Sequence, residues 1–548
     1  MTVLLFLILL VWLIGACLRI VRQARFYQIE EYMSGRYLRW LLAQRYRWLP
    51  GRPFLAWFVG AGLAFFLAEA PGSPLPAIIA LLAAGIGAYP ERDKEVKKAL
   101  KFTDRVKRML AAAFVLAVAL ALAGAALVLS LPTDSPEIPA VIAASMGFAL
   151  VIAAPLLLVT GNLLMTPVEA LLRARFEAQA RAVLAEANLT VIGITGSYGK
   201  TSTKTYLAHI LNSRYKAYPT PKSYNTLMGV CIAINNDIAN NRSLEYFIAE
   251  MGAYIPGEIE RICDLTHPSI SIVVEVGPQH LERFGTLENI ASAKYEIIRA
   301  LPPDGVGVFN WDNPYVRAMY ERGYPQTRIA VSRAVDPAQV PADGPRLIAS
   351  NVEESLNGLS FTVTDTHSNQ REDFQTPLLG QHNVTNVLLA TAVALHEGVP
   401  LKDVARAVRS LQPAESRLVR NVLPEGITVI NDAYSANPVG VVHALRVLGM
   451  HQTGKRLLIT PGMVELGPLM ESENRKLGEI AAQYATDVIL VGARQTDAVK
   501  QGLLNVGFPA ERLHITATLA EAVEWYQTNL QTGDTVLFLN DLPDVYAS

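Results

Sequence analysis

The chain has 548 residues, of which 51% are hydrophobic and 18% are charged, and its formal net charge is −1. This length predicts several domains, and the mean hydropathy of +0.25 is high for a wholly soluble protein. The near-zero charge averages basic loops with an acidic remainder and therefore says little about partners. We expect no nucleic-acid partner. The three cysteines have no metal-ligand spacing and are predicted to be free thiols.

Apolar residues are concentrated before about residue 166. Three runs are long enough to cross a bilayer core of about 30 Å, and they cover residues 1–20, 110–131 and 138–165. Two shorter runs, 54–70 and 75–89, fall near the usual lower limit of about 17 residues. A membrane hairpin and a buried soluble hairpin both remain open for this pair. We predict an α-helical membrane region of about five spans over residues 1–166.

The charges that flank these runs predict their orientation. No basic residue precedes the first run, so it does not resemble a cleaved signal peptide. Arginines and lysines cluster in residues 19–52 and 92–108, whereas residues 71–74 and 132–137 contain none. The positive-inside rule places both basic clusters in the cytoplasm. We therefore predict a multi-pass protein of the cell membrane, in contact with membrane lipid, with its N-terminus outside and its C-terminal part cytoplasmic.

The rest of the chain has the pattern of an α/β protein. Residues 167–187 predict an amphipathic linker helix, and strands then alternate with helices, which is typical of parallel sheets covered by helices. We predict one α/β domain over 188–412 and a second over 413–548, with a ligand-binding cleft where they join. The predicted strands are 191–195, 247–251, 271–274 and 307–310 in the first domain, and 427–431, 456–460, 487–491, 514–516 and 535–539 in the second.

A glycine-containing loop follows the first of these strands, in the segment VIGITGSYGKTST at residues 191–203. Glycines let backbone N–H groups approach a polyphosphate, and the N-terminus of the next helix adds positive charge. Lys200 is placed to reach the phosphates, and the Thr201 hydroxyl to bind Mg²⁺. Ile194 occupies the first glycine position of the strict pattern, so a chance glycine turn is the alternative. The predicted phosphate-binding residues are Thr195, Gly196, Ser197, Gly199, Lys200, Thr201 and Ser202.

Three further residues of the first α/β domain are candidates for chemistry. Glu250 ends a predicted strand, where ligands of open α/β sheets bind. His280 comes just after another strand, and Lys294 lies on the helix that follows. Taken singly, such a glutamate is usually a cap and such a lysine is usually solvated.

The sequences and the order of several segments give these three residues more weight. From Val191 onward the chain resembles the Mur ligase family, most closely its D-alanyl-D-alanine-adding branch. The resemblance extends over about 350 residues, in the family's order. It implies a P-loop central domain and a Rossmann-like C-terminal domain. The segments that carry it are TGSYGKTST, EMGAYIPGEI, GPQHLERFGTLENIASAKYE, FNWDNP, LLGQHNVTNVLLATAVAL, SRLV and NDAYSANP.

The resemblance implies a metal site with two Mg²⁺ ions. Thr201 and Glu250 match ligands of one ion, and His280 matches a ligand of the second. Lys294 matches a lysine that such enzymes carry as a carbamate, which would convert a cation into an anion able to ligate Mg²⁺; an ordinary surface lysine is the alternative. Lys200, His280 and Lys294 are thus the expected catalytic residues.

The resemblance also implies further contacts to ATP from two segments of the chain. These residues are His382, Asn383 and Asn386 for the adenine, Arg417 and Asp432 for the ribose and phosphate, and Tyr434 and Asn437 for the γ-phosphate and incoming substrate. For Asn383, Asn386 and Arg417, helix packing or a surface ion pair is the alternative.

The expected reaction is amide formation through an acyl phosphate, with release of ADP. ATP and Mg²⁺ are the expected cofactors, an amino acid or dipeptide is the amine donor, and the carboxylate acceptor is lipid-linked or UDP-linked. We expect a membrane-anchored peptide ligase of cell-wall precursor synthesis, such as D-alanyl-D-alanine addition to a muramoyl peptide. A ligase for another polymer, polyglutamate-like or amidated, and a nucleotide-binding membrane scaffold are the alternatives.

The sequence departs from the family in the regions that select substrates. Apolar segments stand where the branch has a domain for a uridine-diphosphate sugar. The family's N-N-E-like stretch appears as SYNT at 223–226, with only Asn225 matching. Residues 461–467 read PGMVELG where Gly-Asp-Met is typical, and 539–542 read LNDL where Lys-Gly-Ser-Arg is usual. The identity of both substrates is therefore open.

Overall fold

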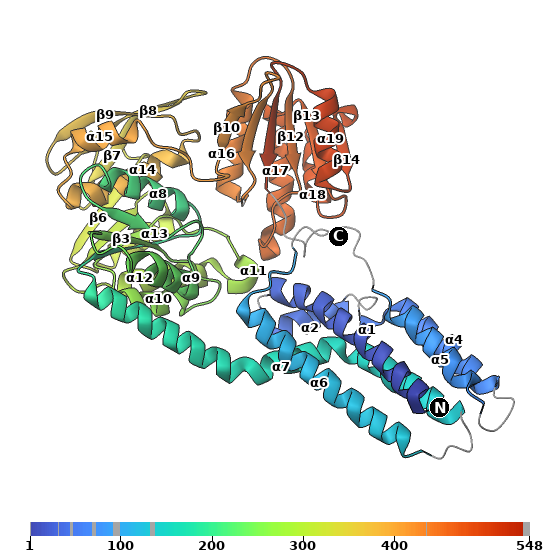
Figure 1. The fold of residues 1–548 in the computed structure, drawn as a ribbon. Helices are drawn as coiled ribbons and strands as arrows, with labels where there is room; N and C mark the ends of the chain where they lie inside the picture. The colour runs from blue at the N-terminus through green and yellow to red at the C-terminus, as the bar shows by residue number, and fades with distance from the viewer. Residues whose placement is uncertain are drawn as a thin grey trace. The chain divides into compact units, whose positions relative to one another are not determined.

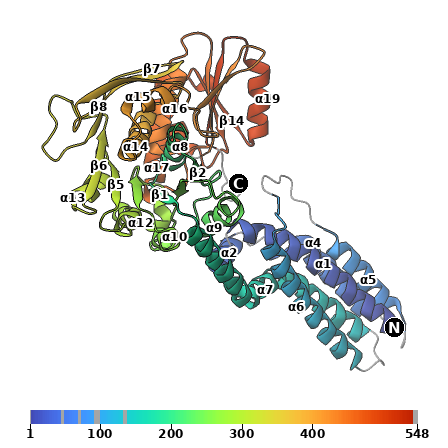
Figure 2. The same ribbon diagram turned by 60° about the vertical axis from the view of Figure 1, so that its left-hand side comes forward.

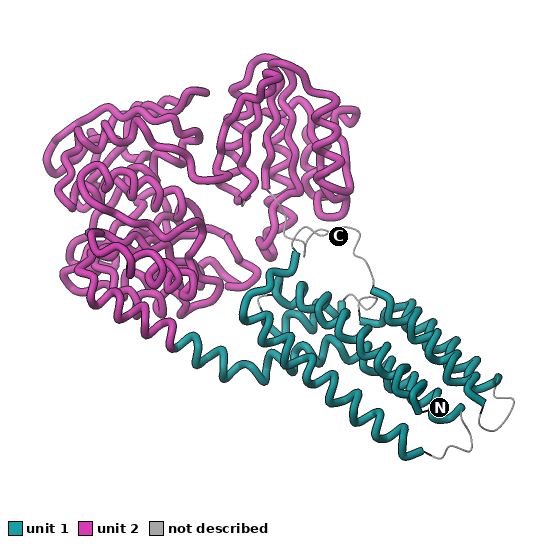
Figure 3. The backbone as a smooth tube through the Cα atoms, viewed as in Figure 1, with its two compact units in different colours: residues 1–174, 543–545 teal, residues 175–542, 546–548 magenta. Residues whose placement is uncertain are grey.

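The computed structural model describes residues 2–30, 32–43, 48–67, 73–90, 99–131, 137–434 and 436–540. The chain divides into two compact units between residues 174 and 175 (Figure 3). The first unit is built of helices, and the second contains both predicted α/β domains.

The first unit consists of helices that lie side by side (Figure 1), and their buried residues include many alanines beside larger apolar side chains. Trp12 is fully buried, and a Cβ atom built on either Gly87 or Gly147 would lie 2.4 Å from its ring. Both positions therefore need glycine for close helix packing. The helices are α1 (Thr2–Ile29), α2 (Ser34–Ala43), α4 (Gly51–Phe66), α5 (Leu75–Ala88), α6 (Asp104–Leu129) and α7 (Glu137–Glu186), the last of which continues into the second unit.

Three of these helices, α1, α6 and α7, are long and apolar enough to cross a membrane. Helices α4 and α5 have 16 and 14 residues, fewer than the roughly 17 that a span requires. The expectation of about five spans is therefore not confirmed, because among the described helices only α1, α6 and α7 are candidates. The predicted basic loop at 92–98, residues 45 and 47, and the connections 68–72 and 132–136 lie outside the described residues, so the orientation stays a prediction.

No helix boundary separates the last apolar run from the predicted linker helix. Helix α7 has 50 residues and passes through Pro155 and Pro167 to Glu186. The linker of 167–187 is thus the C-terminal part of this long helix.

The first α/β domain contains a nine-stranded sheet with the order β2-β3-β1-β4-β5-β6-β7-β8-β9. Strands β2 to β7 are parallel, and β7, β8 and β9 are antiparallel. The predicted strands are confirmed as β1 (Thr190–Thr195), β3 (Tyr246–Glu250), β4 (Ile270–Val273) and β5 (Val306–Asn310). The sequence analysis did not identify β2 (Ala217–Pro219), β6 (Thr327–Ser332), β7 (Leu347–Ser355), β8 (Gly358–Asp365) or β9 (Gln370–Thr376).

Helices cover both faces of this sheet, which explains why its central strands are apolar throughout rather than alternating. Ile192 packs in a core with α8 (Lys200–Leu211) and α14 (His382–His396). Its neighbour Val191 packs in a second core with α9 (Leu227–Ala233), α10 (Glu258–Thr266) and α12 (Leu287–Arg299) (Figure 2). The remaining helices of this domain are η1 (Ile234–Ile238), α11 (Leu281–Phe284), α13 (Pro314–Glu321) and α15 (Leu401–Val408).

The second α/β domain contains a six-stranded sheet with the order β10-β11-β15-β12-β13-β14, in which only β10 is antiparallel. Five strands were predicted, and β10 was not. The strands are β10 (Val419–Val422), β11 (Thr428–Asp432), β12 (Arg456–Thr460), β13 (Asp487–Val491), β14 (Leu513–Thr516) and β15 (Thr535–Leu539). The helices are α16 (Pro438–Gly449), η2 (Gly467–Leu469), α17 (Met470–Tyr484), α18 (Asp497–Asn505), η3 (Ala510–Arg512) and α19 (Leu519–Asn529).

Candidate active site

The loop between β1 and α8 folds as a cradle at the carboxyl edge of the first sheet. Gly199 has φ +76°, in the left-handed region, and a Cβ atom there would lie 2.6 Å from Oδ1 of Asn386. Glycine therefore allows both the turn and the approach of α14. Lys200 folds back across the loop, and its Nζ donates to the carbonyls of Gly196 (2.6 Å) and Ser197 (3.2 Å).

Two of the predicted phosphate-binding hydroxyls anchor this loop to neighbouring segments. Oγ1 of Thr195 donates to the carbonyl of Met251 at 2.8 Å. Oγ of Ser197 donates to the carbonyl of Gly277 at 3.0 Å. These contacts position the loop, while Thr201 and Ser202 line the adjoining cleft.

The electrostatic surroundings of Lys200 suit an anionic ligand. Burial lowers its pKa to about 8, which the nearby carboxylate of Glu250 opposes and the Arg417 guanidinium reinforces. Its two hydrogen-bond partners are neutral carbonyls. A phosphate oxygen would therefore be a stronger partner for the ammonium than those it has.

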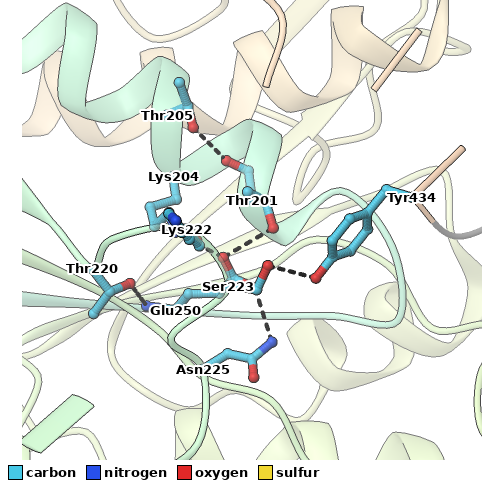
Figure 4. A network of polar contacts seen from close by, with 9 residues as sticks. All are labelled: Thr201, Lys204, Thr205, Thr220, Lys222, Ser223, Asn225, Glu250 and Tyr434. Carbon is cyan, nitrogen blue, oxygen red and sulfur yellow. Dashed lines mark hydrogen bonds and ion pairs between the residues drawn. The ribbon is translucent and has the colours of Figure 1, made fainter. Parts of the chain in front are cut away.

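Glu250 lies at the end of β3, is 1% exposed, and is the centre of a polar network (Figure 4). Its Oε2 accepts a hydrogen bond from Thr201 Oγ1 and forms an ion pair with Lys204 Nζ, both at 3.0 Å. Its Oε1 accepts from Nδ2 of Asn225 at 3.2 Å. Burial alone would raise the pKa of Glu250, but Lys204 and Lys200 outweigh it, so that the pKa is lowered.

This network fits one of the two predicted metal sites. A hydroxyl and an ionised carboxylate meet beside the phosphate loop, and oxygen ligands of this kind are those that Mg²⁺ prefers. The sequence analysis missed Lys204, although its place one helical turn after Lys200 was a signal that it faces the same side of α8.

A second contact joins the segment 223–226 to the C-terminal domain. The hydroxyl of Ser223 is hydrogen-bonded to the hydroxyl of Tyr434 (Figure 4). The guanidinium carbon of Arg417 lies 4.3 Å from the centre of the Tyr434 ring, a cation–π contact. The structure thus brings Tyr434 close to the network around Glu250.

His280 lies at the start of α11 with φ +55°. Its Nδ1 is hydrogen-bonded to Glu465 of the C-terminal domain, and its ring packs against Tyr254 with a centroid distance of 4.6 Å. Burial lowers the pKa of His280, and Glu465 opposes that shift. Among the residues that the structure describes, no three His, Cys, Asp or Glu side chains gather as a metal site. The second ion stays a prediction.

Lys294 lies on α12 and is only 3% exposed, so the alternative of an ordinary surface lysine is wrong. Burial and the nearby ammonium of Lys200 lower its pKa to about 7, although Glu296 and Glu258 oppose the shift. An amine with this pKa is largely neutral near pH 8.

The predicted nucleotide-binding residues of the two domains mostly line one cleft. Those that line it are His382, Asn386, Arg417, Asp432 and Asn437, together with Tyr198, Gly199, Thr201 and Ser202 of the loop and its helix. Asn383 instead lies beneath the cleft: its Oδ1 accepts from Tyr206 Oη and from Nδ2 of Asn386, both at 3.0 Å. Asn383 therefore holds Asn386 in place from within the protein.

The C-terminal side of the cleft carries a buried carboxyl group and a helix cap. Burial raises the pKa of Asp432 to about 6, which Arg417 opposes, and its Oδ1 accepts from the backbone N–H of Leu418 at 3.1 Å. Oδ1 of Asn437 accepts from the N–H of Gly440 at 2.8 Å and so caps α16.

Several lining residues were not identified from the sequence. Burial raises the pKa of Glu275 to about 7, and its carboxyl accepts hydrogen bonds from Asn310 (3.0 Å) and Asn313. The segment FNWDNP contained both asparagines and was the one available signal. Neither Glu275 nor Arg333, which also lines the cleft, belongs to a pattern that singled it out.

Two residues that differ from the family's sequence pattern, Gly462 and Asn540, are in contact in the C-terminal domain. Nδ2 of Asn540 donates to the carbonyl of Gly462 at 2.7 Å, and its Oδ1 accepts from the N–H of Ala436 at 3.3 Å. Gly462 has φ +81°, in the left-handed region. The two changes are therefore parts of one local arrangement. Residues 541 and 542 of this segment lie outside the described residues.

Comparison with known proteins gives consistent matches. The model of the Mur ligase middle domain matches residues 194–394, and that of the Mur ligase, glutamate ligase domain, matches 416–540. A UDP-N-acetylmuramoyl-tripeptide–D-alanyl-D-alanine ligase of Bacillus subtilis is 28% identical over 360 residues, covering 66% of this chain and 74% of that protein. The ligase of the same name from Mycobacterium leprae is 31% identical over 381 residues, covering 65% of this chain and 72% of that protein.

Solved structures agree with this assignment. The crystal structure of MurF from Acinetobacter baumannii is 26% identical with a TM-score of 0.57, covering 67% of this chain and 77% of that chain. MurF ligase from Thermotoga maritima in complex with ADP has the same fold, with a TM-score of 0.58 at 22% identity, covering 68% of this chain and 81% of that chain. Mur ligases use ATP and Mg²⁺, for which the cleft and the Thr201–Glu250 pair provide suitable groups. The chain belongs to the Mur ligase family and is an ATP-dependent peptide ligase of that type.

Proposed function

We propose that this chain is a membrane-anchored ligase that adds D-alanyl-D-alanine to a muramoyl peptide at the cytoplasmic face of the membrane. The observation that carries the proposal is a single cleft lined by the phosphate loop, Thr201, Arg417 and Asp432. The relatives from Bacillus subtilis and Mycobacterium leprae bear the name of this activity.

Acyl activation would use residues that line the cleft, Thr201, Arg417 and Asp432, together with Lys200 and Glu250, which do not line it. The substrate carboxylate attacks the γ-phosphorus of ATP, which forms an acyl phosphate and releases ADP; the amine then displaces phosphate and forms the amide. Lys200 stabilises the negative charge on the transferring phosphoryl group. Thr201 and Glu250 would hold Mg²⁺, which neutralises phosphate charge. Arg417 and Asp432 orient the nucleotide from the C-terminal domain, so the protein mainly positions the reactants.

Lys294 is the proposed carbamate. Loss of one proton from the ammonium gives the neutral amine, whose Nζ forms a bond to the carbon of CO₂ and releases a second proton, so that an anion replaces an ammonium. This is supported by the burial of the side chain and by the finding that no described residue forms a hydrogen bond or ion pair with it. An unpaired buried ammonium is costly, whereas a carbamate would supply oxygen ligands for the second Mg²⁺ that the resemblance assigns to His280.

Anchoring in the membrane is supported by the first unit. Helices α1, α6 and α7 have the length and composition of spans. Large apolar side chains such as Phe66 (82% exposed), Val115 (68%) and Phe6 (52%) are exposed on this unit. Exposed apolar surface on this scale is typical of contact with lipid or with another protein.

A second candidate function is amide formation on another polymer. It is favoured by the hydrogen-bonded pair Gly462 and Asn540. Both residues lie in segments that differ from the family's motifs, in the domain that receives the amine in the family. This candidate predicts dependence on a single amino acid or ammonia rather than on a dipeptide.

The decisive experiment is a ligase assay with the full chain in lipid nanodiscs. With ATP, Mg²⁺, UDP-N-acetylmuramoyl-tripeptide and D-alanyl-D-alanine, we expect ADP release in step with a pentapeptide product identified by mass spectrometry. Product formed only from a single amino acid would favour the second candidate. If no acceptor and amine in a broad panel elicits ADP release, the proposed function is wrong.

A further inference from the structure

The cleft extends from the phosphate loop along the carboxyl edge of the first sheet. The strands that follow β1 in this direction are β4, β5 and β6. Neighbouring strands lie about 4.8 Å apart, so the ends of β1 and β6 are about 14 Å from each other. This span is comparable with the length of an extended nucleotide, so phosphates at the loop place the base near the ends of β5 and β6. The residues that line the cleft there are Glu275, Asn310, Asp312, Asn313 and Arg333.

Two buried asparagines at this end of the cleft direct their donors to Glu275. Nδ2 of Asn310 donates to Oε2 of Glu275 and to the carbonyl of Val274, both at 3.0 Å. Nδ2 of Asn313 donates to Oε1 of Glu275 and, at 2.9 Å, to the carbonyl of Val276. Because a side-chain amide has two N–H donors, both amides spend all of their donors within the protein.

The acceptors around Glu275 have partners in the protein as well. Oδ1 of Asn310 accepts from the N–H of Asp312, and Oδ1 of Asn313 accepts from the N–H of Val316 and so caps α13, both at 3.1 Å. The oxygens of Asp312 accept hydrogen bonds from the Ser332 hydroxyl and from the backbone N–H of the next residue. These side chains therefore hold the turn after β5 and the carboxyl group of Glu275 in place.

Glu275 is different, because its carboxyl group keeps acceptor sites for a ligand. An ionised carboxylate offers about four lone-pair sites, and its hydrogen bonds from described residues are the two from the asparagines. The side chain lines the cleft and is only partly buried. Burial raises the pKa of Glu275 to about 7, a rise that Asn313 and Arg333 oppose. At pH 8 the group is therefore mostly ionised and only accepts hydrogen bonds.

We propose that Glu275 is a specificity-determining residue that accepts a hydrogen bond from the 6-amino group of adenine, with Asn310 and Asn313 as positioning residues that hold its carboxylate. The 6-amino group is a donor, whereas the 6-oxo group of hypoxanthine or guanine is an acceptor that an ionised carboxylate repels. This inference rests on the proposed function, in which the phosphates of ATP lie at the loop after β1.

The test measures nucleotide binding to the full chain in lipid nanodiscs by isothermal titration calorimetry, at pH 8 with Mg²⁺. The probes are ADP, purine riboside diphosphate, which lacks the 6-amino group, and inosine diphosphate, which has a 6-oxo group. We expect ADP to bind about tenfold or more tightly than either of the others, as one charge-assisted hydrogen bond implies.

Glu275→Gln should change the choice of base rather than nucleotide binding as a whole. Its amide can accept from a 6-amino group or donate to a 6-oxo group. The preference for ADP over inosine diphosphate should therefore fall about tenfold, and inosine diphosphate should bind more tightly than it does to the unmodified chain. A misfolded variant would not gain this affinity. Glu321→Gln, exposed on α13 outside the cleft, is the matched control and should keep the original preference.

The other outcomes overturn the inference. Equal binding of ADP and purine riboside diphosphate to the unmodified chain shows that the 6-amino group is not recognised. Inosine diphosphate that binds as tightly as ADP shows that the carboxylate contacts another edge of the base. An equal loss of ADP and inosine diphosphate binding in Glu275→Gln shows a merely structural role for this residue.

Ligation is measured in parallel with ATP and the panel of acceptors and amines. If ADP is selected through Glu275 but no acceptor is ever ligated, the proposed function fails while the recognition of the base stands. If ligation proceeds equally well with ATP and inosine triphosphate, the recognition of the base fails while the proposed function stands.

Discussion

In the second unit, the carboxyl edge of each sheet has polar residues and a glycine at the ends of three neighbouring strands, but the two sets of residues differ. In the first sheet, the neighbouring strands β3, β1 and β4 lead to Glu250, Gly196 and Glu275. In the second sheet, the neighbouring strands β11, β15 and β12 lead to Asp432, Asn540 and Gly462.

The first edge has buried charges held by further charges and amides, and its phosphate loop matches the family closely, although the segment 223–226 beside it keeps only Asn225 of the family's pattern. At the second edge, Asn540 and Gly462 stand where the family has other residues, and Nδ2 of Asn540 donates a hydrogen bond to the carbonyl of Gly462 at 2.7 Å. The difference teaches that the two edges can change separately, since the phosphate loop keeps the family's sequence whereas Gly462 and Asn540 depart from it.

The largest effect is expected at the first edge, from Lys200→Ala. Removal of the ammonium should lower kcat about 10³-fold, as loss of a preorganised charge at the transferring phosphoryl group does. The measurement is ADP release coupled to product formation. Lys216→Ala, an exposed lysine of the same domain, should have little effect. Equal activity of Lys200→Ala and the unmodified chain would contradict the role of the loop.

The buried ion pair at the first edge is tested by Lys204→Met. Both side chains are nearly inaccessible, so an uncompensated Glu250 should lower the free energy of unfolding by about 3 kcal/mol. Because the pKa of Glu250 is lowered from 4.5 in the folded chain, its ionised form stabilises the fold above that pH, and this contribution is lost as the pH falls through the folded pKa.

The difference between Lys204→Met and the unmodified chain should therefore be largest near neutral pH and shrink in acid. Chemical denaturation at several pH values measures it. The double variant with Glu250→Met serves as control, and it should recover most of the lost stability because no buried charge remains. A pH-independent difference would show that Lys204 acts through packing.

Lys294→Ala tests whether this buried side chain of α12 is a carbamate. Activity should fall about 10²-fold through loss of the anion that the carbamate would supply, and added acetate should restore part of it. Lys402→Ala, exposed on α15, is the control and should need no rescue. In the unmodified chain, labelled CO₂ should give a carbamate carbon signal by NMR that Lys294→Ala lacks. Absence of both rescue and signal would exclude the carbamate.

The smallest effect is expected at the second edge, from Asn540→Asp. The carboxylate still accepts from Ala436 but no longer donates to the carbonyl of Gly462, so the free energy of unfolding should fall by about 1–2 kcal/mol. If this edge recognises the amine, its KM should rise severalfold while the KM for ATP is unchanged. Asn505→Asp, exposed on α18, is the control. A matching rise in both KM values would show that the two edges are not separate.

The sequence by itself determined the elements whose signals are local. Glycines at the loop and apolar runs at the strands placed β1, α8, four of the nine strands of the first sheet and five of the six strands of the second, because turn chemistry and burial on both faces are visible in consecutive residues. The family resemblance also paired Thr201 with Glu250, and the structure shows them hydrogen-bonded.

Only the tertiary structure decided which distant groups meet. The ion pair of Lys204 and Glu250, the contact of His280 with Glu465 and the bond from Asn540 to Gly462 join residues 46 to 185 positions apart. The buried state of Lys294 and the shortness of α4 and α5 were also settled there. Charge pairing and burial depend on distances across the fold, which no pattern of neighbouring residues encodes.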